Sequence, residues 1–213
     1  GSHADTAAYY RPLIRFLAAQ PDAAARAWRV EVPFTAGHWE AYRLAPRFLL
    51  ARGWERQTDI ADDPLFYDGR LTAARYRTWL HALAVRYVAV ADAPPDYAAR
   101  AELRLIRAGL PYLRVVARLR HWTVYAVADP IPLASGAGRV VSVQPASLRL
   151  AITRRGSIEV RVRWSPYWQL GGVHGCVAPA GGFTRVSADA PGRAVLRMRF
   201  ALGRVGSRAP RCD

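Results

Sequence analysis

Residues 139–207 follow a two-residue hydrophobic alternation, and this pattern limits what the chain can fold into more than any other feature. In SLRLAIT, the residues Leu148, Leu150 and Ile152 fall on one side of an extended strand, and SIEVRVRW and RAVLRMRF repeat the arrangement. No helical spacing interrupts these segments. The alternation therefore predicts a small antiparallel β-sandwich domain over residues 139–213.

The first part of the chain mixes helical and strand patterns and predicts a different kind of domain, over residues 5–130. Helical spacing alternates with short Val-rich segments, an order typical of an α/β unit. The expected helices are 6–19 (interrupted early by Pro12), 38–45, 72–84 and 97–109. The expected strands are 29–34, 86–92 and the two strands of a hairpin, YLRVVARL and HWTVYAVA. Residues 62–69 are expected to form a loop. PIPLASGAG at 130–138 has the composition of a linker. The predicted fold class is a two-part α+β or α/β chain, with an N-terminal α/β unit followed by the sandwich.

The chain is strongly basic, and its charge is concentrated in the second domain. The net charge is +15, and all 31 Lys and Arg residues are Arg. Residues 1–130 contain 18 Arg and 13 acidic residues, a net of +5, whereas residues 131–213 contain 13 Arg and 3 acidic residues, a net of +10. Such a field attracts anionic lipid headgroups, polyanionic cell-wall polymers or nucleic acid.

If the apolar residues of the sandwich face its core, the arginines between them point outward. This set comprises Arg149, Arg161, Arg163, Arg197 and Arg199. Two interpretations are open: an anion-binding face, if the strands are neighbours, or a solvated surface in an Arg-rich protein. Nucleic acid is disfavoured as the ligand, because the strand aromatics Trp164 and Phe200 fall on the apolar face instead of between the arginines.

An aromatic pair lies in a turn of the second domain. SPYWQLGGVHGC places Tyr167 and Trp168 between Pro and Gly residues. Exposed aromatic rings on sandwich loops can stack on the apolar faces of sugar rings. The alternative is that the rings pack under the sheet as a plug.

The two cysteines, Cys176 and Cys212, are spaced too widely to suit a zinc site, which needs four clustered ligands. They are either two unrelated buried thiols or a disulfide that attaches the C-terminal tail. A disulfide would imply an oxidising compartment.

The stretch GHWEAYRLAPRFLLARGWERQTD at 37–59 concentrates aromatic and charged residues. His38, Glu40, Glu55 and Asp59 are candidates for acid–base chemistry, and glycoside hydrolysis needs two carboxyl groups at a fixed separation. The arginines of the stretch can instead pair with these carboxylates and lock the loop. The same stretch could instead bind a glycan, and the candidate residues for this are Trp39, Glu40, Arg52, Trp54, Arg56 and Asp59.

Motifs for other chemistries are missing from the sequence. SGAGRV lacks the third glycine of the dinucleotide pattern and precedes a strand, and there is no G-x-S-x-G. Neither H-x-x-x-H nor C-x-x-C occurs, and no apolar run reaches the roughly 18 to 20 residues that span a bilayer. We expect no metal site and no cofactor.

Several segments together resemble one group of proteins. The run RVEVPFTAGHWEAYRLAPRFLLARGWERQTD, followed by LFYDG, YRTWLHALAVRYVAV, GLPYL and HWTVY, is similar to actinobacterial multi-pass membrane proteins that look like glycosyltransferases of the GT-C type. These enzymes use polyprenyl-phosphate sugars outside the cell. The similar region is their soluble extracytoplasmic part near the C-terminus, and it covers nearly the whole chain.

The resemblance implies a location on the extracytoplasmic side of the plasma membrane, with the transmembrane part of the same polypeptide as partner. The catalytic acid and lipid-phosphate site of GT-C enzymes lie in loops of the membrane bundle, so this chain is expected to hold no catalytic residues. Its expected role is to position a cell-envelope glycan acceptor or to brace the bundle. Two alternatives stay open: a free-standing basic nucleic-acid-binding protein, and a soluble glycoside hydrolase that uses Glu40 with Glu55 or Asp59.

Overall fold

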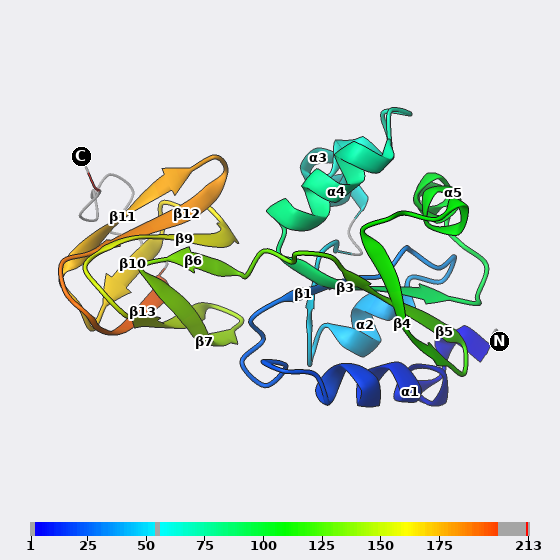
Figure 1. Cartoon of the computed structure of the whole chain (residues 1–213), viewed down its shortest axis with the longest axis horizontal. Helices are drawn as coiled ribbons and strands as arrows, with labels where there is room; N and C mark the ends of the chain where they lie inside the picture. The colour runs from blue at the N-terminus through cyan, green and yellow to red at the C-terminus, as the bar shows by residue number, and fades with distance from the viewer. Residues whose placement is uncertain (1–2, 54–55, 200–211, 213) are drawn as a thin grey trace. The chain divides into compact units, whose positions relative to one another are not determined.

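The computed structural model describes residues 3–53, 56–199 and 212, and the chain forms two compact units. One contains a mixed sheet with helices, and the other contains two antiparallel sheets (Figure 1). The predicted fold class, an α/β unit followed by an antiparallel β-sandwich, is confirmed. The first unit comprises Gly1–Ala23 and Trp28–Ile131, and the second comprises Ala24–Ala27 and Pro132–Asp213.

The first unit is built on a five-stranded sheet with the order β2-β1-β3-β5-β4. Strand β1 pairs in parallel with β2 and β3, whereas β5 runs antiparallel to both β3 and β4. The strands are β1 (Arg29–Glu31), β2 (Leu49–Leu50), β3 (Val85–Ala91), β4 (Leu113–Leu119) and β5 (Trp122–Val127).

Helices cover both faces of this sheet, with α1 and α2 on one face and α3, α4 and α5 on the other (Figure 1). Threonine side chains cap two of them: Thr6 accepts from the Tyr9 amide before α1, and Thr72 accepts from the Arg75 amide before α4. The helices are α1 (Ala7–Ala18), α2 (Trp39–Leu44), α3 (Arg56–Asp62), α4 (Ala73–Ala82) and α5 (Arg100–Ala108), with 3-10 turns at His3–Asp5, Pro64–Phe66 and Tyr97–Ala99.

The core between α1 and the sheet explains why this helix continues through Pro12, where the sequence predicts an interruption. Tyr10, Leu13 and Leu17 are fully buried against sheet residues that include Val30. Tertiary packing contributes more to the stability of a helix than local propensity does. Apolar burial on this face therefore outweighs the hydrogen bond that proline cannot donate.

Four other elements differ from the sequence prediction. Strand β1 ends at Glu31 instead of residue 34, because Pro33 has no amide proton for a strand ladder. The two-residue strand β2 and helix α3 were not expected, and α3 fills a span with no clear hydrophobic period. The segment predicted as a linker contains strand β6, Ala134–Gly136.

The second unit packs two four-stranded antiparallel sheets, with the orders β10-β13-β8-β7 and β11-β12-β9-β6. Leu148, Leu150, Ile158 and Leu196 are buried between them, as the alternation predicts. The strands are β7 (Gly138–Gln144), β8 (Ser147–Ile152), β9 (Gly156–Arg163), β10 (Trp168–Gly171), β11 (Gly175–Ala180), β12 (Phe183–Ala188) and β13 (Gly192–Met198). Across the described part of the chain, no helix has the length and apolar character needed to cross a bilayer.

Candidate functional site

A buried ion pair holds the centre of the stretch 37–59. Arg52 follows β2, and its guanidinium donates two hydrogen bonds to Asp59 of α3, at 2.9 Å from Nε and 2.6 Å from Nη2. Arg52 is 3% exposed and Asp59 is 2% exposed. This bidentate geometry is the strongest form of an arginine–carboxylate contact. The alternative in which arginines of this stretch pair with its carboxylates therefore holds for Arg52 and Asp59.

Aromatic rings enclose the same guanidinium. Its carbon atom lies 4.1 Å from the centre of the Phe34 ring and 3.8 Å from that of Phe66. Burial alone would lower the pKa of Arg52, but the Asp59 hydrogen bonds and the charges of Glu31 and Glu102 raise that pKa overall. Arg52 therefore stays charged and inaccessible to a ligand.

Two further carboxyl groups face Arg52 from β1 and α5. Its Nη1 lies 3.9 Å from Glu31 Oε1 and 3.5 Å from Glu102 Oε2, and both glutamates have zero exposure. Burial raises the pKa of Glu102 to about 7. Burial and the neighbouring Glu102 charge raise the pKa of Glu31 well above its ordinary value. One cation cannot neutralise three carboxylates at this depth, so protons remain on the glutamate pair near neutral pH.

Neighbouring hydroxyl and indole groups complete this polar core. Tyr76 donates a hydrogen bond of 2.6 Å to Glu102, and Tyr67 donates one to Asp59. Trp79 Nε1 donates one of 2.7 Å to Asp63. The cluster thereby joins β1, β2, α3, α4 and α5, and its polar groups serve the fold.

Glu40 has a separate structural partner. Its carboxylate accepts hydrogen bonds from the Thr35 amide at 3.0 Å and from the Thr35 hydroxyl at 2.7 Å, which closes the turn before α2. Burial raises the pKa of Glu40. His38, in this turn, lies 3.4 Å from Asp96 through its Nε2. Glu40 is 2% exposed, so it faces no open cleft.

These positions correct part of the glycan-binding expectation for the first unit. Glu40, Arg52 and Asp59 are buried and cannot contact a glycan, because each is used in an internal hydrogen bond or ion pair. Trp39 is 41% exposed on α2. Trp54, Glu55 and the side chain of Arg56 lie outside the described residues.

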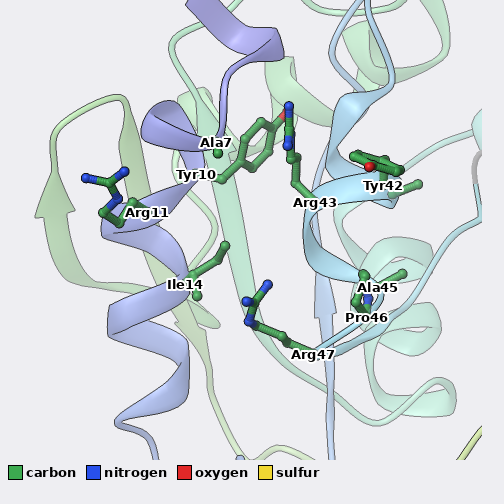
Figure 2. A pocket seen from close by; sticks show the side chains of 10 residues that line it. Ala7, Tyr10, Arg11, Ile14, Tyr42, Arg43, Ala45, Pro46 and Arg47 are labelled. Atoms are coloured by element: carbon green, nitrogen blue, oxygen red, sulfur yellow. The ribbon is translucent and has the colours of Figure 1, made fainter.

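A groove lies between α1 and α2, with a volume of about 700 Å³. Figure 2 shows Tyr10 and Ile14 extending from α1 toward α2, with Arg43 and Arg47 on the opposite side. The lining residues are Ala7, Tyr10, Arg11, Ile14, Ala41, Tyr42, Arg43, Ala45, Pro46 and Arg47. Sequence reasoning missed this site. Its one local signal is the presence of arginines in and just after the two expected helices: Arg11 lies within 6–19, Arg43 within 38–45 and Arg47 just beyond 45.

The outward arginines of the sandwich do not form one face. Arg149 and Arg197 lie on the outer surface of the sheet β10-β13-β8-β7, together with Arg139 and Arg193, and all four are exposed. None of these four strands, all fully described, contains Asp or Glu. We call these four residues the arginine face.

The remaining three arginines of the predicted set lie elsewhere. Arg161 and Arg163 are on β9 in the other sheet, where Arg161 lies 3.2 Å from Glu159 and donates to the Ser135 hydroxyl at 2.9 Å. Arg199 is exposed just after β13. A shared face requires neighbouring strands, and Arg161 and Arg163 do not meet this condition, because their strand belongs to the opposite sheet.

In the aromatic turn of the second unit, Trp168 packs inside the sandwich. This residue is 6% exposed, and its Nε1 donates a hydrogen bond of 3.0 Å to the Arg163 carbonyl. Tyr167 is half-buried. Trp168 is therefore not available for stacking on a sugar, because its ring is buried.

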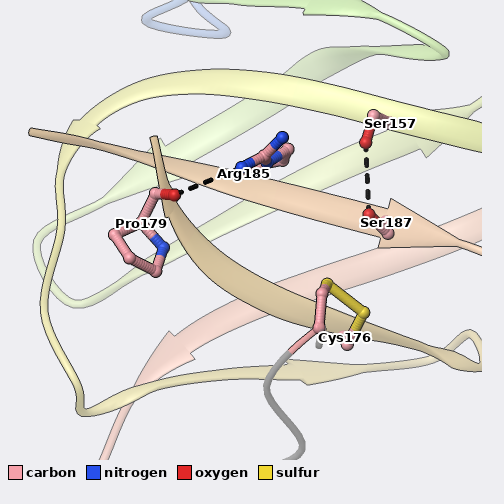
Figure 3. The surroundings of a disulfide bond; sticks show 6 residues. Ser157, Cys176, Pro179, Arg185 and Ser187 are labelled. Carbon is pink, nitrogen blue, oxygen red and sulfur yellow. Dashed lines mark hydrogen bonds between the residues drawn. A yellow bond between two sulfur atoms is a disulfide. The ribbon is translucent and has the colours of Figure 1, made fainter. Parts of the chain in front are cut away.

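A disulfide joins Cys176 on β11 to Cys212, 36 residues further along the chain (Figure 3). Of the two alternatives for the cysteines, the cross-link is the one that the structure contains. Beside it, Ser157 and Ser187 share a hydrogen bond of 3.2 Å between β9 and β12. The cross-link attaches the C-terminal Cys212 to an outer strand of the sandwich.

Comparisons with known proteins add no relatives. No protein family, no curated protein and no solved structure matches this chain. Among the residues that the structure describes, no cluster of three or more His, Cys, Asp or Glu side chains is placed to hold a metal ion.

Proposed function

We propose that this chain is a non-catalytic extracytoplasmic domain of a membrane-embedded glycosyltransferase-like protein, in which it positions a cell-envelope glycan acceptor or supports the membrane part. The observation that carries the proposal is the internal use of the carboxylates in residues 37–59. Asp59 is held by Arg52, and Glu40 is held by Thr35. A domain whose acidic groups are structural is suited to binding and support instead of acid–base chemistry.

The same geometry argues against glycoside hydrolysis by Glu40 with Asp59. A general acid must reach the leaving-group oxygen, and its partner carboxylate must reach the sugar or a water. Glu40 and Asp59 are both about 2% exposed. Glu55 lies outside the described residues, so the hydrolase alternative rests on that residue.

Two features support a position outside the cell beside an anionic surface. Disulfides persist mainly in oxidising compartments, and Cys176 is bonded to Cys212. The arginine face presents four cations with no acidic residue on its strands. Arginine near an anionic membrane contributes on the order of 1 kcal/mol per residue, which suffices to orient a tethered domain.

Turnover assays test the non-catalytic part of the proposal. The purified chain should neither hydrolyse aryl glycosides nor transfer sugar from polyprenyl-phosphate donors, because the residues expected to do so lie in a membrane bundle. Measurable turnover that disappears in Glu40→Gln or Glu55→Gln would overturn the proposal. The complete gene tests the placement: many transmembrane segments joined to this chain would support it, and a gene that encodes none would contradict it.

A further inference from the structure

The groove between α1 and α2 combines positive charge with an apolar wall. Three of its lining residues are Arg11, Arg43 and Arg47, and none of the lining residues is acidic. Ile14 and several small side chains form the rest of the wall, with Tyr10 fully buried and Tyr42 68% exposed. A volume of about 700 Å³ lies within the size range of sites that bind small organic molecules.

The arginines of the groove have no carboxylate partner among the described residues. Arg43 Nη2 donates a hydrogen bond of 2.6 Å to the backbone carbonyl of Asp5, and its guanidinium lies 5.2 Å from the centre of the Tyr42 ring. The Nε of Arg43 is buried and has no hydrogen-bond partner in the described part of the chain. A buried charged donor without an acceptor costs stability, so the described residues satisfy the Arg43 guanidinium only in part.

Arg43 and Arg47 also repel each other. Both line the groove, Arg43 from α2 and Arg47 from the segment that follows this helix, so two like charges face the same small space. An anionic ligand would relieve this repulsion. The guanidinium fork matches phosphate oxygens in two parallel hydrogen bonds, and a phosphate monoester carries nearly two negative charges, which suits more than one arginine.

The size and the apolar wall of the groove indicate that the ligand is larger than phosphate itself. An organic group attached to the phosphate would pack on Ile14 and on the exposed Tyr42 ring, whereas inorganic phosphate would leave these surfaces in water. We propose that the α1/α2 groove binds an organic phosphate ester, with the phosphate held by Arg11, Arg43 and Arg47. This inference goes beyond the proposed function, because it depends on the groove alone.

Calorimetric titration with four probes tests the proposal and distinguishes the sources of the ester. The probes are glucose 1-phosphate, monomeric dioctanoyl phosphatidic acid, inorganic phosphate and glucose. We expect at least one ester to bind more tightly than inorganic phosphate, with little binding of glucose. The ester that binds then identifies a sugar phosphate or a lipid phosphate as the natural chemistry.

The variant Arg11→Gln/Arg47→Gln should weaken ester binding by about tenfold or more, since each lost arginine removes a charge-assisted hydrogen bond. Both side chains are exposed, so the fold should persist, which the melting temperature checks. The matched control is Arg104→Gln/Arg107→Gln, which removes the same charge from exposed positions on α5. It should bind the ester as the unmodified chain does.

Three results would overturn the proposal. The first is no binding of either ester, and the second is an inorganic phosphate affinity equal to that of both esters. The third is an equal loss of ester affinity in the α5 control, which would show that the net charge of the protein, and not the groove, determines binding. Amide chemical shifts give an independent readout: shifts at Ile14 and Ala41 support the site, and shifts confined to Pro132–Met198 contradict it.

Discussion

The Tyr76 hydroxyl donates a hydrogen bond of 2.6 Å to Glu102, which joins α4 to α5 through a carboxyl group with zero exposure. Glu31 and Arg52 lie beside it, and burial, together with the charge of Glu102, raises the pKa of Glu31. The interior of the first unit therefore contains a group that titrates near neutral pH, and the stability of this unit should depend on pH.

The direction of that dependence follows from the raised pKa. Burial raises the pKa of Glu102 from its ordinary 4.5 to about 7. Between these values the folded protein keeps a proton that the unfolded chain releases, so the free energy of unfolding falls as pH rises. We expect the protein to be about 2 kcal/mol less stable near pH 8 than near pH 5.

Glu102→Gln should remove most of this loss, because glutamine cannot ionise and still offers an oxygen to Tyr76. Urea unfolding of both proteins at the two pH values measures the effect. Glu159→Gln, at an exposed position on β9, is the control and should keep the original pH dependence. An unchanged slope in Glu102→Gln would show that another group titrates.

The Arg52–Asp59 pair should contribute far more to stability than a similar pair on the surface. Asp59→Asn leaves the Arg52 charge buried without its bidentate partner, and we expect a loss of about 3–5 kcal/mol. Arg75 and Asp68 form a matched control: they have the same seven-residue separation and lie 2.9 Å apart, but they are exposed. Asp68→Asn should cost far less, because water screens this exposed pair. Thermal or urea unfolding measures the loss of stability in each variant. Equal losses in the two variants would contradict the prediction that burial makes the Arg52–Asp59 pair more important.

The disulfide should stabilise the second unit mainly by restricting its unfolded chain. Closing a loop over the 36-residue separation corresponds to about 3–4 kcal/mol in the chain-entropy model. Cys176→Ser/Cys212→Ser should therefore lower the free energy of unfolding by that amount. The unreduced protein, unfolded in denaturant, should release no thiol to a colorimetric reagent. Detection of two thiols would contradict the cross-link and weaken the extracytoplasmic placement.

The arginine face should bind anionic membranes, and the opposite sheet should bind them less. Replacing Arg139, Arg149, Arg193 and Arg197 with Gln should abolish co-sedimentation with phosphatidylglycerol vesicles at low salt, since each arginine contributes on the order of 1 kcal/mol. The control replaces Arg161, Arg163 and Arg185, of which Arg161 is already paired with Glu159. Binding should also fall at physiological salt, where charges are screened beyond about 8 Å. Equal pelleting with phosphatidylcholine would identify the face as ordinary solvated surface.

The sandwich could be predicted from local pattern because a strand places successive side chains on opposite sides. Leu148, Leu150, Ile158 and Leu196 are buried as their spacing requires. The same rule showed that the intervening arginines point outward. It could not assign them to sheets, because the pairing of β8 with β13, and of β9 with β12, joins residues far apart in the sequence.

The sequence by itself determined the two-part fold class, the faces of the strands and the concentration of charge, since these depend on periodicity and composition. Tertiary structure decided the rest. It buried Glu40, Arg52 and Asp59, although charged residues are expected at the surface from sequence alone. It also brought Glu31 and Glu102 close to the guanidinium of Arg52. It also formed the groove from α1 and α2, whose arginines are about thirty residues apart. Long-range packing brings such groups together, and local spacing carries no information about which distant residues will meet.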